Sequence, residues 1–330
     1  MTLPADFINL SQKIGAQPLL VQGPGGNTSV KIGGEMWIKA SGTKLSEALD
    51  KNIFVAVDPA KAKQELNGAG DGSCRSALID PDCGLRPSIE TTFHAMFDQP
   101  FVFHFHSVAT ICHAIAEEGR HALSEKLSGL QWVSAPYRKP GIPLSKAIRD
   151  AVGTKQVQIV VLNNHGIIIV GNTIDEVSHL IDDVERRLHL PILAEGEPKA
   201  SPATCSGWQY VPEVCALATD PLLFKRATSG TYYPDHVVFL GPAMPSLPAS
   251  ELARLNPDEF PVPAVLVEGQ GVYLKSDAKP AQRAMLDCIY HVLSRIPEDW
   301  TLAPIGEEAE AELLNWDAEK YRQALAKRSA

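Results

Sequence analysis

The stretch FVFHFHSVAT, residues 101–110, constrains this chain more than any other part of its sequence. It is an apolar run of strand-forming residues that carries two histidines, His104 and His106, one residue apart. Residues two apart in a strand face the same side, so two imidazoles lie together on one face of a buried strand. Such a pair suits two ligands of one divalent metal ion, although hydrogen-bonded core histidines produce the same pattern.

A third histidine, His165, lies in the sequence NNHG between two runs of β-forming residues within 156–171. The pattern predicts a tight turn, in which a lone histidine is usually just a turn residue. Taken with His104 and His106, it completes a set of three imidazoles. Three neutral imidazoles and one open coordination position describe a catalytic zinc site.

Three further side chains are candidates for a role beside such a metal. Glu90 stands at the predicted N-terminus of a helix, where the dipole favours its ionised form. It would serve there as a base or a fourth ligand, and otherwise it is an ordinary first-turn acid. His94 follows one turn later and either supports the site or packs in the core. Tyr137 has basic neighbours that would lower its pKa, although a single loop tyrosine is usually structural.

The balance of charges argues against two broad classes of partner. The 330 residues carry a formal net charge of -9, so we expect no extended binding to nucleic acid or to an anionic membrane. Six cysteines form no CxxC motif, which favours reduced thiols and a cytoplasmic location. We find no signal peptide and no apolar run near the roughly 18 residues of a membrane span.

Periodicity, caps and turn signals predict a mixed α/β organisation. The predicted strands are 53–58, 101–106, 236–241, 264–269 and 271–276, with a hairpin turn at Gly33-Gly34. The predicted helices are 5–16, one that begins after Ser88 as N-cap, 107 to 118, 174–190 and 279–296. Residues 60–75 are small and polar and are predicted to form an exposed connection.

Two motifs of small residues have the composition of anion-binding turns. GPGGNTS, residues 23–29, is followed by a hairpin pattern and not by a helix, which excludes the dinucleotide-binding fingerprint. Its backbone N–H groups could still wrap an anion, as could KASGTK, residues 39–44, with its flanking lysines. A plain turn is the other interpretation of each motif.

Six motifs in a fixed order resemble the class II aldolase/adducin family: GGNTSVK, KASGT, PSIETTFHAMF, VFHFHS, PYRKPG and LNNHGIIIVG. The resemblance covers about residues 5–195, and the ordered set is specific. The family includes the zinc-dependent L-fuculose-phosphate and L-rhamnulose-phosphate aldolases. PSIETT with HFHSV looks more like the aldolase part of rhamnulose-phosphate aldolase/dehydrogenase fusions, although nothing after residue 200 carries the Gly-rich fingerprint of the dehydrogenase.

The resemblance implies a set of site residues. His104, His106 and His165 would bind Zn²⁺, or another divalent metal such as Mn²⁺ or Co²⁺. Glu90 would be the acid/base beside the metal, and Tyr137 would protonate the leaving aldehyde oxygen. The phosphate-binding positions of the family fall on Gly26, Asn27, Ser41, Gly42 and Ser88. Ile89 departs from the pattern, because fuculose-phosphate aldolases have a second serine there and this chain lacks its hydroxyl.

The implied fold is a three-layer α/β/α domain with a mostly antiparallel central sheet, in enzymes that are commonly homotetramers with sites between subunits. The implied activity is that of a lyase, which cleaves a C–C bond of a ketose phosphate or related polyol ketone through a metal-stabilised enediolate. The same chemistry supports decarboxylation or epimerisation, which family members also perform. A non-enzymatic, adducin-like interaction module is another alternative, but such proteins lose the metal histidines that this chain keeps.

We expect residues 1–195 to form the catalytic domain, 196–230 a linker and 231–330 a small C-terminal α+β extension. In that extension TYYPDH, residues 231–236, could form a lid, reach a neighbour's site, or stabilise the fold or an oligomer. Trp316 and Tyr321 are expected to anchor the last helix-like stretch.

Overall fold

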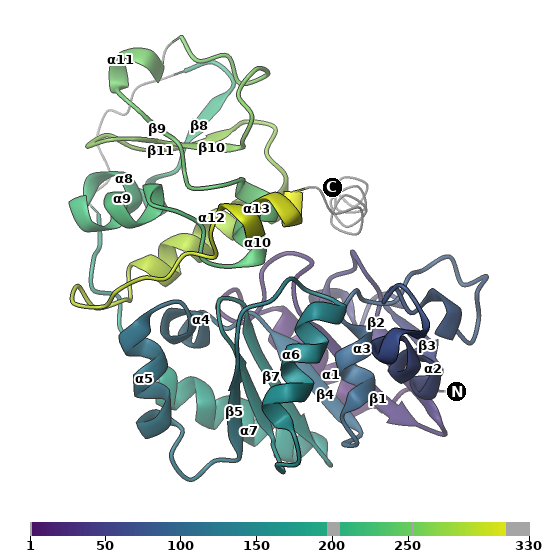
Figure 1. Ribbon diagram of the computed structural model, residues 1–330. Coiled ribbons are helices and arrows are strands. Elements are labelled where there is room, and N and C mark those ends of the chain that lie inside the picture. The colour runs from purple at the N-terminus through teal and green to yellow at the C-terminus, as the bar shows by residue number, and fades with distance from the viewer. Residues whose placement is uncertain (1, 197–204, 253, 315–330) are drawn as a thin grey trace.

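The computed structural model describes residues 2–196, 205–252 and 254–314. Within them the chain forms a larger N-terminal unit around a seven-stranded sheet and a C-terminal unit around a four-stranded sheet (Figure 1). No helix in this part of the chain combines the length and the apolar character that a membrane span requires. All six cysteines are free thiols.

The central sheet of the N-terminal unit is mostly antiparallel, as predicted. Its strands are β1 (Asn27–Ile32), β2 (Glu35–Lys39), β3 (Phe54–Val57), β4 (Phe101–Phe105), β5 (Trp132–Ala135), β6 (Ile159–Leu162) and β7 (Gly166–Gly171). They lie in the order β3-β2-β1-β4-β7-β6-β5, and only the pair β5 and β6 is parallel. The β1–β2 hairpin turns at Gly33 and Gly34, where positive φ angles favour glycine.

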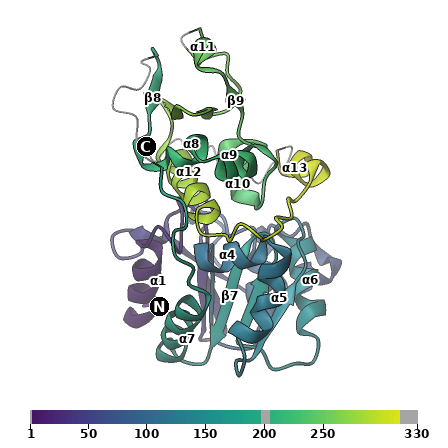
Figure 2. The same cartoon turned by 90° about the vertical axis from the view of Figure 1, so that its left-hand side faces the viewer.

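Helices cover both faces of this sheet and give the unit three layers, as predicted. They are α1 (Ala5–Gly15), α2 (Pro59–Gln64), α3 (Thr91–Met96), α4 (Val108–Ala114), α5 (Glu117–Lys126), α6 (Ile142–Val152) and α7 (Ile174–Leu188). Phe103 of β4 packs in one core with side chains of α1 and α7, and its neighbour Val102 packs in another core with α3 and α6. Figure 2 shows the sheet between α1 and α7 on one side and α6 on the other.

Strand β4 occupies the middle of the sheet and delivers the histidine pair. His104 is opposite Asn27 of β1 on one side and Ile168 of β7 on the other. The strand ends at Phe105, and the Ser107 hydroxyl then accepts a hydrogen bond from the Thr110 N–H as the N-cap of α4. His106 therefore lies in the short connection between a buried strand and a capped helix, where its backbone is fixed from both sides.

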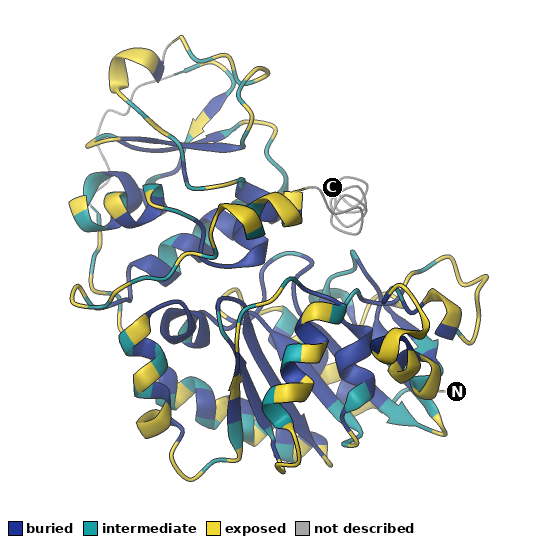
Figure 3. Ribbon diagram, in the orientation of Figure 1, coloured by how far each residue is buried: buried dark blue, intermediate teal, exposed yellow. Residues whose placement is uncertain are grey.

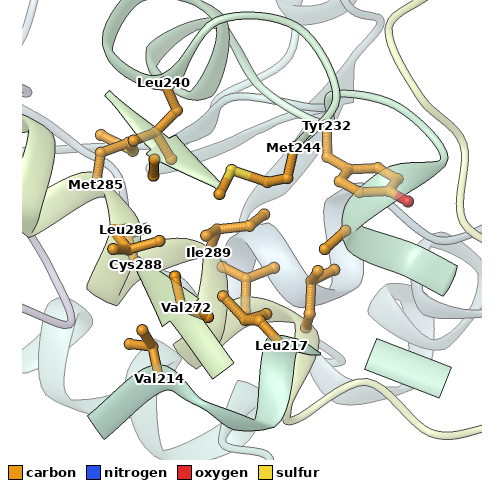
Figure 4. Close-up of a cluster of buried hydrophobic side chains, with 14 of the residues drawn as sticks. Val214, Leu217, Tyr232, Leu240, Met244, Val272, Met285, Leu286, Cys288 and Ile289 are labelled. Carbon is orange, nitrogen blue, oxygen red and sulfur yellow. The ribbon is translucent and has the colours of Figure 1, made fainter. Parts of the chain in front are cut away.

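The C-terminal unit is an α+β module. Its strands are β8 (Trp208–Tyr210), β9 (Ser246–Leu247), β10 (Ala264–Val267) and β11 (Gly271–Lys275), and its helices are α8 (Ala216–Thr219), α9 (Pro221–Thr228), α10 (Pro234–Leu240), α11 (Ala249–Leu252), α12 (Pro280–Leu293) and α13 (Glu307–Leu314). Its core packs Ile289 of α12 against Val272 and Leu217 (Figure 4). Ile111 of α4 belongs to the same core, so the two units share buried apolar surface.

Several predicted elements differ from the structure. Residues 236–241 were predicted as a strand but belong to the helix α10, whose seven residues are all buried. The helix α10 is buried along its length (Figure 3). A short, mostly apolar run fits a buried helix as well as a strand. Residues 60–75 begin with α2 and a following π-helical turn, because the Asp58 carboxylate caps the N-terminus and Pro59 fits the first helical position.

Two helix boundaries near the candidate site also differ. Ser88 was predicted to cap a helix, but α3 begins at Thr91 and the Ser88 hydroxyl accepts from the Glu90 N–H at 3.2 Å. The helix predicted for 107 to 118 ends at Ala114, and Gly119 lies inside α5.

The predicted linker, 196–230, contains β8, α8 and α9. We therefore propose that the boundary between the two units in the sequence lies shortly after α7, and that β8, α8 and α9 belong to the C-terminal unit. Trp316 and Tyr321 lie outside the described residues.

Candidate metal centre

Three histidines meet at one end of the central sheet. His104 comes from β4, His106 follows it, and His165 lies in the turn between β6 and β7. All three side chains are buried, and one nitrogen of each lies within 4.8 Å of the others. The Nε2 atoms of His104 and His106 are 3.2 Å apart. The sequence prediction that these residues converge is therefore met in the structure.

The other ring nitrogens show which tautomer two of these imidazoles adopt. Nδ1 of His104 lies 2.9 Å from the Ile167 carbonyl oxygen, and Nδ1 of His106 lies 3.1 Å from Oδ2 of Asp235. A carbonyl oxygen only accepts, so Nδ1 of His104 carries the proton and its Nε2 presents a lone pair. The carboxylate beside Nδ1 of His106 favours the same tautomer there, through a contact at ion-pair distance that is not an aligned hydrogen bond. Two lone pairs at 3.2 Å repel one another unless a cation lies between them.

The burial of the cluster also favours the neutral form that binds metal ions. Burial lowers the pKa of His104, and it lowers the pKa of His165 to about 3. Nδ1 of His165 has no hydrogen-bond partner among the described residues. Divalent transition metals are bound by neutral, convergent imidazoles whose Nδ1 atoms face an oxygen atom, as they do in two of these histidines. The residues present therefore fit such an ion.

Glu90 lies directly beside the three imidazoles. Its Oε2 is 3.4 Å from Nε2 of His104, and its Oε1 is 3.6 Å from Nε2 of His165. Burial disfavours the charged carboxylate, whereas the hydrogen bond from Asn27 favours it, and the pKa of Glu90 is lowered from its ordinary value. Oε1 has no hydrogen-bond partner among the described residues, so one carboxylate oxygen faces the cluster with a free lone pair.

A network of buried, hydrogen-bonded side chains supports Glu90 on the side away from the histidines. Nδ2 of Asn27 donates to Oε2 of Glu90 at 2.7 Å and to the Ser88 hydroxyl at 3.1 Å. The Asn27 carbonyl faces Nε2 of His94, and Nδ1 of His94 is 2.8 Å from the Ser29 hydroxyl. Burial holds the pKa of His94 well below its ordinary value, so the ring is neutral and donates from Nε2 alone. His94 is therefore part of the support of this site.

A narrow pocket opens beside the histidines. The residues assigned to phosphate binding by sequence resemblance all line it: Gly26, Asn27, Ser41, Gly42 and Ser88. Lys39 adds a buried ammonium, whose Nζ donates to the carbonyls of Pro24 and Thr43. The pocket has a cavity volume of about 20 Å³, which is enough for one or two waters.

Tyr137 is separate from the pocket of its own chain. It is not among the residues that line the pocket, and its buried hydroxyl has no hydrogen-bond partner in the described part of the chain. The expectation of a lowered pKa is wrong, because burial, with a smaller contribution from Glu312, raises the pKa of Tyr137. The basic neighbour Arg138 directs its guanidinium to the Tyr137 backbone carbonyl instead.

Sequence reasoning missed one residue of the site. Asp235, with its neighbour Pro234, comes from α10 of the C-terminal unit and lines the pocket. The only sequence signal was the run TYYPDH, whose polar residues stood out in an apolar stretch. Nothing in the sequence connects that run to the histidine strand.

The fold and the site together define a class: a three-layer α/β/α domain with a three-histidine cluster and a carboxylate at the end of its central strand. Residues 5–192, more than half of the chain, match the family model "Class II Aldolase and Adducin N-terminal domain". The chain therefore belongs to the class II aldolase/adducin family.

Similar proteins match a little more than half of the chain. The N-terminal class II aldolase domain of a conserved protein from Thermoplasma acidophilum is 25% identical, with a TM-score of 0.50 over 57% of this chain and 94% of that chain. L-fuculose-1-phosphate aldolase from Thermus thermophilus is 17% identical, with a TM-score of 0.39 over 56% of this chain and 89% of that chain.

A curated relative is named an uncharacterized oxidoreductase, YuxG, of Bacillus subtilis. It is 29% identical over 182 residues, which are 51% of this chain and 26% of YuxG. The matched part of this chain thus spans about a quarter of the length of that relative.

Proposed function

We propose that this protein is a metal-dependent lyase that cleaves a C–C bond of a ketose phosphate or a related polyol ketone. The observation that carries the proposal is the convergence of three buried imidazoles with the Glu90 carboxylate at the mouth of a pocket lined for an anion. The family relationship supports the class of chemistry, since the matched residues include the whole cluster.

His104, His106 and His165 would hold the metal, which we propose to be Zn²⁺ or another divalent ion such as Mn²⁺ or Co²⁺. When bound, it would supply Lewis-acid stabilisation of the negative charge that C–C cleavage leaves on the substrate oxygens. Glu90 would accept and return the proton of the reacting hydroxyl through Oε1, while Asn27 keeps the other carboxylate oxygen in place.

The opposite wall of the pocket suits a charged end of the substrate. Ser41 and Ser88 offer hydroxyl groups, Gly26 and Gly42 expose backbone, and Lys39 supplies positive charge. Ile89 also lines the pocket and offers an apolar side chain where the related aldolases have a serine. This lining supports a phosphate or another anionic group with fewer hydroxyl donors around it.

The pocket is narrow in this structure. A volume of about 20 Å³ is far below the roughly 300 Å³ of ordinary small-molecule sites, so a sugar-sized substrate requires the walls to separate. Tyr137 lies outside the pocket of its own chain, and its role as proton donor to the aldehyde half would require the homo-oligomer with sites between subunits that the family resemblance implies. We propose such an oligomer, a tetramer, in the cytoplasm.

Metal analysis of the purified protein tests the proposal first. We expect about one divalent ion per chain in the wild type and its loss in His104→Ala. The exposed His121 of α5 offers a matched control, since His121→Ala removes an imidazole that lies outside the cluster. A wild type that binds no metal after reconstitution with Zn²⁺, Mn²⁺ or Co²⁺ contradicts the proposal and favours the adducin-like alternative.

Product analysis then separates the possible reactions. The metal-loaded protein is incubated with a panel of ketose phosphates and free ketoses, and the products are identified by mass spectrometry. We expect an aldehyde and a three-carbon ketone, lost in Glu90→Gln while the metal content is unchanged. Release of CO₂ or an epimerised sugar would instead assign decarboxylation or epimerisation to the same residues.

A further inference from the structure

We propose that the C-terminal unit, residues 205–314, completes the metal centre through Asp235, which acts as a positioning residue for His106. The inference rests on the metal site of the proposed function but not on the reaction carried out there. The family match ends at residue 192, so Asp235 lies in a part of the chain to which the family assigns no role.

The contact between the two residues is direct and dry. Asp235 is the second residue of α10 and is 3% exposed, and His106 is 4% exposed. Oδ2 of Asp235 lies 3.1 Å from Nδ1 of His106, on the side of the ring that faces away from the other two histidines. A carboxylate at this distance favours the imidazole tautomer with the proton on Nδ1, which leaves the Nε2 lone pair for a metal.

Gly25 makes room for this contact. A methyl group at that position would lie 3.0 Å from Nδ1 of His106 and 3.1 Å from Oδ2 of Asp235. Both distances are shorter than ordinary carbon contacts, so a side chain there would separate the ring from the carboxylate. The absence of a side chain at residue 25 thus coincides with a place where the C-terminal unit reaches a metal-binding imidazole.

The three histidines differ in what supports them, which gives Asp235 a specific effect. Nδ1 of His104 donates to a neutral backbone carbonyl, and Nδ1 of His165 has no partner among the described residues. Of the three, His106 is the one whose Nδ1 faces a carboxylate, an arrangement that orients the imidazole ring and strengthens it as a metal ligand. Removal of the charge should weaken metal binding through His106 without any change at the other two ligands.

The segment that leads into α10 is tied to the loop of the third histidine. Nδ2 of Asn164, the residue before His165, donates to the backbone carbonyl of Tyr232 at 2.9 Å. The Tyr232 hydroxyl in turn donates to the Arg226 carbonyl of α9 at 2.7 Å. The position of Asp235 is therefore fixed relative to both parts of the chain that supply metal ligands.

The experiment compares Asp235→Asn with wild type, and uses Asp220→Asn as the control. Asp220 caps α9 in the same unit by accepting from the Leu223 N–H, so its replacement perturbs the unit without touching the metal centre. The full-length proteins are stripped of metal, and Zn²⁺ affinity is measured by competition with a chromogenic chelator. The visible spectrum of the Co²⁺-loaded protein reports ligand geometry, and thermal unfolding of the metal-free protein reports the fold.

We expect Asp235→Asn to lower Zn²⁺ affinity by about 10- to 100-fold and to shift the Co²⁺ spectrum, while Asp220→Asn leaves both unchanged. Asp235→Ala should lower the affinity at least as much. Unchanged affinity and spectrum in folded Asp235→Asn would overturn the inference and leave the proposed function standing. Failure of both Asp235→Asn and Asp235→Ala to fold without metal would also overturn the inference, because Asp235 would then be a structural residue. A wild type that binds no metal would overturn both proposals, whereas weakened binding in a protein without lyase activity would contradict the proposed function alone.

Discussion

Replacement of Asn164 by alanine should destabilise the protein more than any other single change in the turns around the site. Its side chain connects three segments: Nδ2 donates to the carbonyls of Tyr232 and Ala303 at 2.9 and 2.7 Å, and Oδ1 accepts from Nη2 of Arg120 at 2.6 Å. The residue is buried, and its φ of +55° lies in the left-handed region.

The magnitude follows from these contacts. Each of the two neutral hydrogen bonds contributes about 1 kcal/mol, and the bond from the Arg120 guanidinium contributes about 2 kcal/mol. Alanine at a positive φ costs about 1 kcal/mol more than asparagine, which tolerates this region. We therefore expect Asn164→Ala to lower the free energy of unfolding by about 4 to 5 kcal/mol. Asn164→Gly, which is free of the backbone strain, should lower it by about 1 kcal/mol less.

The adjacent residue provides a matched control. Asn163 accepts one hydrogen bond, from the exposed Ser134 hydroxyl, and we expect Asn163→Ala to change the free energy of unfolding by less than about 1 kcal/mol. Urea unfolding of the metal-free proteins, followed by tryptophan fluorescence, measures the three variants against wild type. The reasoning is refuted if Asn164→Ala destabilises the protein no more than Asn163→Ala does.

Three further predictions follow from single sites. Gly26→Ala places a methyl group 2.9 Å from the His104 carbonyl at a φ of +61°, so this variant should weaken Zn²⁺ binding. Gly34→Ala is the control, because a methyl group there meets no atom within 4 Å and should leave Zn²⁺ binding unchanged. Equal Zn²⁺ affinities of the two variants in a chelator competition would contradict this prediction. His94→Phe leaves two buried hydrogen-bonding partners unsatisfied and should lower the free energy of unfolding, measured with urea, by about 2 to 4 kcal/mol. Burial raises the pKa of Glu185 to about 7, so the folded state binds this proton more tightly than the unfolded state and stability falls as pH rises from about 4.5 to about 7. Glu185→Gln should remove this loss and stabilise the protein at pH 8 by up to about 3 kcal/mol, and an unchanged slope of urea midpoint against pH would argue against it.

The parts of the fold that sequence reasoning predicted are those in which local signals agree. The Gly33-Gly34 turn, the alternating β1 and β2, and α7 with its Thr173 cap each combine a period with a boundary signal. The histidine pair was predictable because the period of two in a strand places alternate side chains on one face, and His106 keeps that direction although β4 ends one residue before it.

The elements that were predicted wrongly lack such agreement between local signals. Residues 236–241 are apolar on all sides, so no period separates a helix from a strand, and burial by α12 and α13 decides the outcome. Residues 60–75 look like a polar loop because α2 buries only Ala62 of its six residues. The Asp58-Pro59 pair was the one local signal of a helix start there, and composition concealed it.

The contribution of Asp235 could not have been predicted, because it depends on a contact between two units that are distant in the sequence. The pattern at His104 and His106 identifies which residues could bind a metal, but a strand period carries no information about the other side of the ring. That side is set by how α10 approaches, and the approach is determined by the core that Ile111 of α4 shares with the C-terminal unit. Because α4 begins two residues after His106, the helix that anchors the C-terminal unit also directs its carboxylate to that histidine. The accessory unit and the metal ligand are thus positioned by the same short segment of chain, and the stability of the one should depend on the integrity of the other.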